Sequence, residues 1–310
     1  MSPLSQTGRR LLGALALIAG LSGPAVAQSL APRAYWPAPR GTYVVAFGLN
    51  HQEGGVLTDP SLPLENLEAR TTALQLGLVR FFDLAGRTAS LTLEAPWAET
   101  SLDVRFQGED LHRDLSGQLD LALRLAVNLR GAPSMTPEEF RRFLADPEPM
   151  VGVSLKVQAP TGQYDPERVV NLGTNRWSFR PEIGYLRRLR PGWILELSAG
   201  AWFYGDNDEF LGTTREQDPL AAVEGHLVRP ARGRRQNLWT SLDLNFYSGG
   251  RTSVDGNESD TLQRNSRIGA TVVMPFAGTH ALKLAASTSL ATEVGSDFTS
   301  VIVAWQKAWR

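Results

Sequence analysis

Hydrophobic and polar residues alternate one by one in two stretches near residue 250, and the same pattern recurs along most of the chain. In the first stretch, 236–250, Leu242 and Leu244 alternate with Asp243 and Asn245, and residues 264–276 repeat the pattern. Successive side chains of a β-strand point to opposite faces, so each stretch predicts a strand with one apolar and one polar face. Asp243 and Asn245 lie in mid-strand, which is typical of a strand whose inner face is wet. The repeating unit is therefore a strand, a long polar loop and a second strand.

The alternation predicts about twelve strands, each near the ~9–11 residues that a tilted membrane-crossing strand needs. The first strand is expected near 42–49, and the most regular alternation predicts a strand over 118–129. Short turns at 187–192 and 277–280 contrast with the long connections 50–69, 97–116, 160–176, 205–216 and 248–263. This asymmetry indicates an all-β fold: a transmembrane antiparallel up-and-down β-barrel, with the long connections outside the cell and the short turns in the periplasm.

One connection, 131–149, interrupts the β pattern. Thr136 is followed by Pro137 and Glu139, which predicts a helix N-cap, a proline at the first helical position and a capping-box acid. Phe140 and Phe143 then fall on one helical face, so we expect one short amphipathic helix over 136–145. It could dock on the rim of a barrel or simply cover a sheet edge.

The polar face of each strand defines the candidate functional residues. A dry core would not tolerate unpaired charges at these positions, so we expect them to line the lumen of a barrel. The predicted lumen-lining residues are Glu94, Asp120, Arg124, Lys156, Gln158, Arg180, Glu182, Glu196, Glu224, His226, Asp243, Asn245, Arg267 and Lys283. A soluble exported β-sandwich or barrel would explain the alternation, but not charges in mid-strand opposite Leu and Val faces.

Both signs of charge occur in this set of lumen residues, so they could pair across the interior. Arg124, Lys156, Arg180 and Arg267 come from different strands and could instead form a positive constriction that attracts anions. Barrels of eight strands are filled by side chains and barrels of 16–18 hold a wide channel, so about twelve strands predict at most a narrow pore.

The N-terminus carries the features of a secretory leader. Arg9 and Arg10 precede the apolar run 11–21, and small residues at 25–27 form a cleavage site before Gln28. The apolar run is shorter than the roughly 20 residues of a membrane-spanning helix. We therefore expect a signal peptide at 1–27, an N-terminal periplasmic segment at 28–40 and an outer-membrane barrel at 41–310, in a bacterial outer membrane.

Composition narrows the function further. Cleavage would remove Arg9 and Arg10 and no acidic residue, leaving 29 Lys and Arg against 32 Asp and Glu, a net charge of −3. That balance argues against nucleic-acid binding. The chain contains no cysteine, which removes disulfides, thiolate metal sites and cysteine nucleophiles together. We expect no cofactor.

No sequence motif for catalysis is present: G-x-S-x-G, H-E-x-x-H, the P-loop and G-x-G-x-x-G are all missing. His226 shares a face with Glu224, as a base oriented by a carboxylate would, but a structural lumen pair fits as well because the sequence places no nucleophile nearby. The acidic loop 206–209 lacks the ligand spacing of a calcium loop. We therefore predict neither a catalytic nor a metal site.

A resemblance to a known family begins at residue 160. The blocks PTGQYDPERVVNLGTNRWSFRPEIGY (160–185), WFYGDNDEFLG (202–212), FYSGGRTSVDG (246–256) and RNSRIGATVVMPF (264–276) resemble the outer-membrane family of the meta-pathway of phenol degradation. The resemblance covers roughly residues 150–309. It implies an outer-membrane barrel that admits aromatic or other hydrophobic compounds. Barrels commonly end on an aromatic residue that the insertion machinery reads, whereas here Arg310 follows Trp309.

The expected function is passive uptake of small aromatic or hydrophobic compounds through a barrel channel that is not an enzyme. The expected partners are outer-membrane lipids, these solutes and, through the C-terminal strand, the barrel insertion machinery. Two other functions stay open at this point: a barrel enzyme such as a lipid hydrolase, and a closed structural barrel whose loops bind partners.

Overall fold

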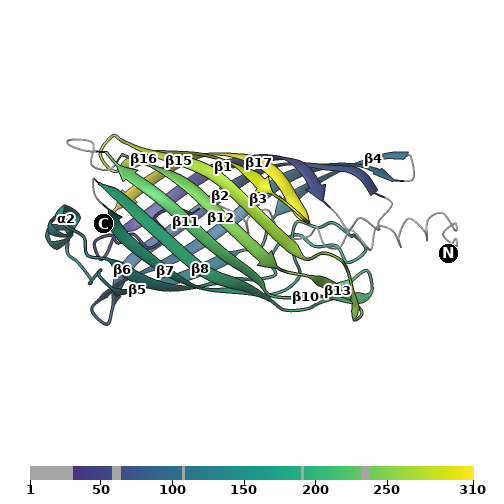
Figure 1. Cartoon of the computed structure of the whole chain (residues 1–310), viewed down its shortest axis with the longest axis horizontal. Helices are drawn as coiled ribbons and strands as arrows, with labels where there is room; N and C mark the ends of the chain where they lie inside the picture. The colour runs from purple at the N-terminus through teal and green to yellow at the C-terminus, as the bar shows by residue number, and fades with distance from the viewer. Residues whose placement is uncertain (1–30, 58–63, 107–108, 190–191, 232–237) are drawn as a thin grey trace.

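The protein folds into a closed antiparallel β-barrel of 12 strands (Figure 1). The computed structural model describes residues 31–57, 64–106, 109–189, 192–231 and 238–310, so the expected leader at 1–27 lies outside the described residues. The barrel strands are β1 (Tyr43–Leu57), β2 (Leu64–Leu84), β3 (Arg87–Phe106), β5 (Ala122–Arg130), β6 (Met150–Gln158), β7 (Ser178–Leu189), β8 (Trp193–Tyr204), β11 (Leu220–Pro230), β12 (Trp239–Gly249), β15 (Gln263–Phe276), β16 (His280–Ala291) and β17 (Gly295–Trp309).

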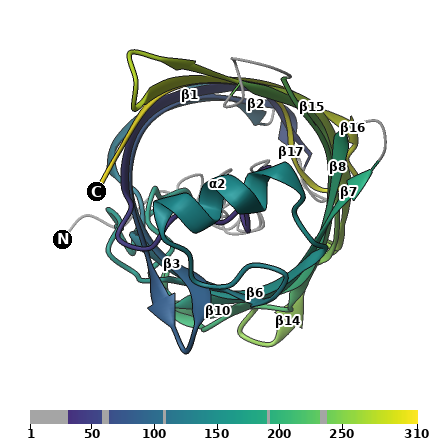
Figure 2. The same cartoon turned by 90° about the vertical axis from the view of Figure 1, so that its left-hand side faces the viewer.

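Each strand of the barrel pairs with the next along the chain, and β1 pairs with β17 from Tyr43 opposite Trp309 to Leu57 opposite Gly295, which closes the ring. The predicted up-and-down transmembrane barrel is therefore confirmed. Figure 2, which looks along the barrel, shows the continuous wall. Closure leaves no unpaired strand edge in the wall, as the hydrocarbon core of a membrane requires.

The two faces of the strands differ as the alternation predicts. On β12, Leu242 is 58% exposed while Asp243 is 1% exposed. Large hydrophobic side chains are exposed around the outer surface, among them Leu74, Leu155, Ile183 and Val303. Aromatic side chains lie near strand ends; those exposed there include Trp177, Phe203, Phe246, Phe276 and Trp309. This outer face has the apolar band with aromatic borders that a membrane-spanning barrel presents to lipid.

Several strand limits differ from the predicted ones. β1 runs to Leu57 rather than ending near residue 49, and the predicted loop 97–116 consists of the end of β3 and a paired strand, β4 (Glu109–Gln118). The outer face of these extensions carries exposed charged side chains such as Arg70, Asp103 and His112, so hydrophobic alternation lapses there although backbone pairing continues. The strand expected over 118–129 is broken at 119–121: Leu119 turns inward against Ala73 and Ala98, and β5 begins at Ala122.

The connections at the same end of the barrel as β4 fold into a cap. The predicted loops 205–216 and 248–263 contain four short strands, β9 (Asn207–Phe210), β10 (Thr213–Gln217), β13 (Thr252–Val254) and β14 (Asn257–Glu258), which form a second sheet. Leu67, Val169 and Phe210 pack together beneath these connections. This end, with its long connections, is the one that the sequence assigns to the outside of the cell.

The opposite end carries the short turns and the predicted helix, α2 (Pro137–Ala145). Thr136 caps the helix by accepting a hydrogen bond from the Glu139 backbone N–H, and the Glu139 carboxylate accepts one from the Thr136 N–H, so the predicted capping box is confirmed. Figure 2 shows α2 across the opening of the barrel, where Phe143 meets the ring of Trp36 edge-on at 6.2 Å. No helix among the described residues is long and apolar enough to cross a membrane.

Candidate functional site

The polar faces of the barrel strands converge on a connected set of charged side chains in the interior. Lys156 Nζ lies 2.6 Å from a carboxylate oxygen of Glu94, across from β6 to β3. Arg180 on β7 lies 2.8 Å from Glu182 and also contacts Glu224 on β11. Arg124 lies 3.6 Å from Glu182. Arg124, Lys156 and Arg180 are therefore each matched by a carboxylate, which leaves them little excess charge with which to form a positive constriction.

A second cluster surrounds His226. Its Nδ1–H donates to Asp243 at 2.8 Å, and its Nε2 lies 3.8 Å from Glu224. The other carboxylate oxygen of Asp243 accepts a hydrogen bond from the Thr271 hydroxyl at 3.0 Å. In the part of the chain that the structure describes, no serine or threonine hydroxyl is hydrogen-bonded to His226, so the cluster has the geometry of a lumen pair rather than of a nucleophile and its base.

Two further predicted residues lie toward the capped end of the barrel. Asp120 accepts four hydrogen bonds: from Gln158, from the Gly162 N–H at 2.8 Å, and from the N–H and hydroxyl of Thr174 at 2.9 and 2.6 Å. Gly162 and Gly173 touch so closely that a Cβ on Gly162 would lie 2.6 Å from the Gly173 Cα, so only glycine fits. Asp120 thus fastens the connection 160–174 to the start of β5.

Arg267 and Asn245 are hydrogen-bonded within the wall of the barrel. Arg267 donates to the Phe298 carbonyl at 3.0 Å and to the Ser287 hydroxyl at 3.1 Å, and Asn245 donates to the Tyr247 hydroxyl at 2.8 Å. The Arg267 side chain therefore joins β15 to β16 and β17, whereas that of Asn245 is held within β12.

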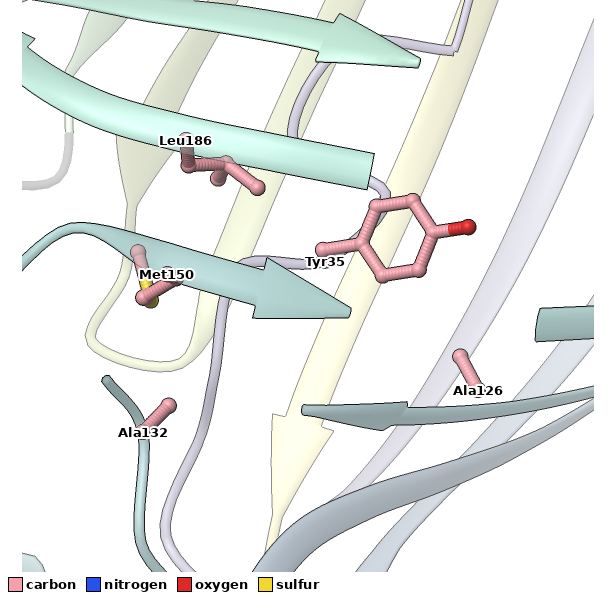
Figure 3. Packing of buried hydrophobic residues seen from close by; sticks show 5 residues of the cluster. All are labelled: Tyr35, Ala126, Ala132, Met150 and Leu186. Atoms are coloured by element: carbon pink, nitrogen blue, oxygen red, sulfur yellow. The ribbon is translucent and has the colours of Figure 1, made fainter. Parts of the chain in front are cut away.

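The N-terminal segment ahead of β1 enters the barrel, which the sequence pattern did not indicate. The Arg33 backbone N–H donates to Glu196 at 2.6 Å, and the Tyr35 hydroxyl is hydrogen-bonded to Ser154 at 2.9 Å and to the Glu182 carboxylate at 2.8 Å. Figure 3 shows the Tyr35 ring among Ala126, Ala132, Met150 and Leu186. Residues 33–36 thus cross from β1 to the opposite wall; which compartment residues 28–40 face stays a prediction.

A pair of glycines makes room for Tyr35. Gly152 and Gly184 are register partners on β6 and β7. An ideal Cβ on Gly152 would lie 2.4 Å from the ring of Tyr35, and one on Gly184 would lie 2.3 Å from it. The ring rests flat against the backbone of the wall because neither position carries a side chain. Glycines that allow such an approach are the sequence signal for this contact, although they do not reveal which residue makes it.

A cavity of about 450 Å³ remains between the N-terminal segment and the wall. Nine of the predicted lumen residues line it: Glu94, Arg124, Lys156, Arg180, Glu182, Glu196, Glu224, His226 and Lys283. Asp120, Gln158, Asp243, Asn245 and Arg267 are outside its lining. Sequence reasoning missed Arg33, Tyr35, Trp36 and Trp202, which also line the cavity.

The walls of the cavity differ in character. Strands β5 to β8 and β11 contribute charged side chains, whereas β1, β2 and β17 contribute mainly small or apolar ones, such as Ala46, Gly48, Gly77, Val79 and Ala304. A solute in this space would meet an apolar surface on one side and polar groups on the other, which is the usual composition of a small-molecule site. No group of three or more metal-ligating side chains occurs in the described ranges.

The fold and this interior define a transmembrane β-barrel of the outer-membrane type. The chain belongs to the family described as "Putative MetA-pathway of phenol degradation", whose model matches residues 51–301. No curated protein sequence gives a match.

Among solved structures, the chain is similar to an outer membrane channel from Pseudomonas putida F1, with 20% identity, a TM-score of 0.76, and coverage of 91% of this chain and 100% of that one. It is also similar to the β domain of the Bordetella autotransporter BrkA, with 12% identity, a TM-score of 0.51, and coverage of 87% and 100%. At these identities the likeness concerns the fold.

Proposed function

We propose that this protein is an outer-membrane channel for the passive uptake of small aromatic or hydrophobic compounds. The observation that carries the proposal is the internal cavity, with its apolar wall on β1, β2 and β17 and its charged wall opposite. A polar lining alone would suit ions and sugars. The apolar wall, in contrast, allows an aromatic ring or a short alkyl chain of a solute to bury its apolar surface away from water. Membership of a phenol-degradation family supports aromatic cargo.

The other parts of the proposal follow from the fold. Residues 1–27 would direct export and be removed, the C-terminal strand β17 would be read by the insertion machinery, and the exposed apolar band would contact membrane lipid. The N-terminal segment narrows the lumen, so flux would be slow for large polar solutes.

The test is ion current through the purified protein in planar lipid bilayers, with phenol or glucose added to one side. A phenol molecule that enters the cavity should interrupt the current, and glucose should do so less. Ala46→Trp, which would fill part of the apolar wall, should weaken the effect of phenol. Intact barrels that pass no current and do not respond to phenol would contradict the proposal and favour a closed structural barrel. Hydrolysis of lipid esters by the same preparation would favour an enzyme.

A further inference from the structure

Lys283 differs from the other cations that line the cavity. Lys156, Arg124 and Arg180 are matched by carboxylates, and Arg33 is bound to Glu196 through its backbone N–H and stacks its guanidinium on Trp36 at 4.1 Å. Within the described ranges, the Lys283 ammonium has neither a hydrogen bond nor an ion pair, although it lines the cavity. Asp243 attracts it electrostatically, but the carboxylate of Asp243 already accepts hydrogen bonds from His226 and Thr271.

The surroundings of Lys283 leave space for a ligand. Its register partner on β17 is Ala304, whose own partner on β1 is Gly48, so the row of side chains beside the lysine is short. These residues belong to the apolar wall of the cavity. An ammonium group next to these short apolar side chains is positioned to bind a compound that combines one negative charge with an apolar body.

A second, independent observation is an excess of hydrogen-bond donors in the same lining. The indole N–H of Trp202 is buried without an acceptor in the described part of the chain, and so is Nε of Arg180. Among the carboxylates of the lining only one oxygen, Oε1 of Glu196, is buried without a donor. Buried donors are normally satisfied, so a lining with donors to spare favours a ligand rich in acceptors.

We propose that the cavity binds small aromatic monocarboxylates, and that Lys283 supplies the counter-charge for their carboxylate. The ring would lie on the wall formed by β1, β2 and β17, next to Ala304 and Gly48. The proposal rests on the proposed uptake function for the route by which the compound arrives, but binding itself requires no transport. It also gives Lys283, rather than the paired Arg180, the leading part in anion recognition.

The experiment is isothermal titration of the detergent-purified barrel with benzoate and with benzamide, its uncharged counterpart. Lys283→Met removes the charge and keeps the length of the side chain, so benzoate affinity should fall about 10- to 100-fold, the loss expected for one charge-assisted hydrogen bond. Benzamide affinity should stay within about threefold. Lys283→Arg should retain benzoate, and Lys307→Met, at an exposed lysine near the end of β17, serves as the matched control.

A second variant tests the site even if Lys283→Met fails to fold. Ala304→Glu would place a carboxylate opposite Lys283 and should compete with benzoate while leaving benzamide binding in place. Benzoate binding that is unchanged in Lys283→Met, or a parallel loss of both compounds in each variant, would overturn the proposal.

Bilayer recordings of the same variants separate this inference from the proposed function. Benzoate binding that depends on Lys283 in a protein that passes no solute would uphold the inference and refute the channel. If the protein passes solutes but its affinity for benzoate does not depend on Lys283, the channel would be upheld and the inference refuted.

Discussion

The contact between Tyr35 and the glycine pair of β6 and β7 provides a direct way to release the N-terminal segment. Gly184→Ala keeps a residue that a strand accepts, but its Cβ would lie 2.3 Å from Cε2 and 2.5 Å from Cδ2 of Tyr35. Carbon atoms in contact lie about 3.5–4.0 Å apart, so the ring has to move by more than an ångström. The wall around Gly184 need not change, because the backbone pairing with Gly152 is preserved.

The size of the effect follows from the two shortest hydrogen bonds of the Tyr35 hydroxyl, at 2.8 Å to the Glu182 carboxylate and 2.9 Å to Ser154. A bond to a charged partner contributes about 1.5–3 kcal/mol and a neutral one about 0.5–1.5 kcal/mol. Loss of both would destabilise the seated segment by roughly 2–4 kcal/mol, which raises the population of the released state about 30- to 1,000-fold.

Single-channel recording in planar bilayers measures this release. Gly184→Ala should show larger or more frequent conductance steps than the unaltered protein, and Gly152→Ala should behave in the same way. Tyr35→Phe should shift the segment in the same direction, because it removes the same two hydrogen bonds. Gly225→Ala is the matched control, since its added Cβ would make only ordinary contacts, at 3.6 Å with Leu197 and 3.9 Å with the Leu244 carbonyl oxygen. A Gly184→Ala barrel that keeps its heat-modifiable gel mobility and conducts like the unaltered protein would refute this account of the segment.

Three further predictions concern the wall, the orientation and the helix. Leu242→Arg should destabilise folding into lipid vesicles by roughly 2–4 kcal/mol near the bilayer midplane, and a fully stable Leu242→Arg barrel would contradict the outward assignment of that face. Asp243→Leu should also be costly because His226 and Thr271 lose their acceptor. Asp243→Asn keeps one acceptor oxygen and should cost less than either. An impermeant thiol reagent on intact cells should label Asn257→Cys and spare Gly278→Cys, and the opposite result would reverse the topology. The hydrogen bond from the Thr136 N–H lowers the pKa of Glu139. The capping box should therefore stabilise α2 at any pH above the ordinary pKa of glutamate, and this contribution should be lost as the pH falls through the lower pKa of the folded state. Amide hydrogen exchange of α2 that does not become faster on acidification would contradict this prediction, and Glu138→Gln serves as the control.

The sequence predicts the wall of the barrel well because one physical rule governs it. Lipid outside and water or charge inside impose a period of two on every crossing strand, so the faces of Leu242 and Asp243 could be assigned from the pattern alone. Where the outer face is charged as well, the rule fails, which is why the pattern predicts a loop over 97–116, where the end of β3 and most of β4 lie. The alternation does not reveal the break at 119–121, because Leu119 occupies an apolar position of the pattern although its side chain packs inward against Ala98.

The candidate site was predictable only in part. The alternation points Lys156, Glu182 and Glu224 inward, but it does not say which charges pair, because pairing depends on strands far apart in the sequence. Tyr35 is separated from Ser154 by 119 residues and from Glu182 by 147, and no local signal joins them. The difference between Lys283 and the other cations of the cavity depends on the same long-range geometry, because it arises from the carboxylates that pair with Arg124, Lys156 and Arg180.

The hydrogen bonds to Asp120 limit how far the capped end of the barrel can move when a solute reaches it. The connection 160–174 is held by hydrogen bonds to the Asp120 carboxylate, which accepts four in all, and the backbones of Gly162 and Gly173 are in contact beside it. It therefore has little freedom to move when a large solute approaches. In the proposed channel such a mouth would act as a rigid sieve, so permeation should fall steeply above a limiting molecular cross-section rather than decrease gradually. Solutes would then be selected by size at this entrance, before the charged side chains deeper in the barrel select them by chemistry.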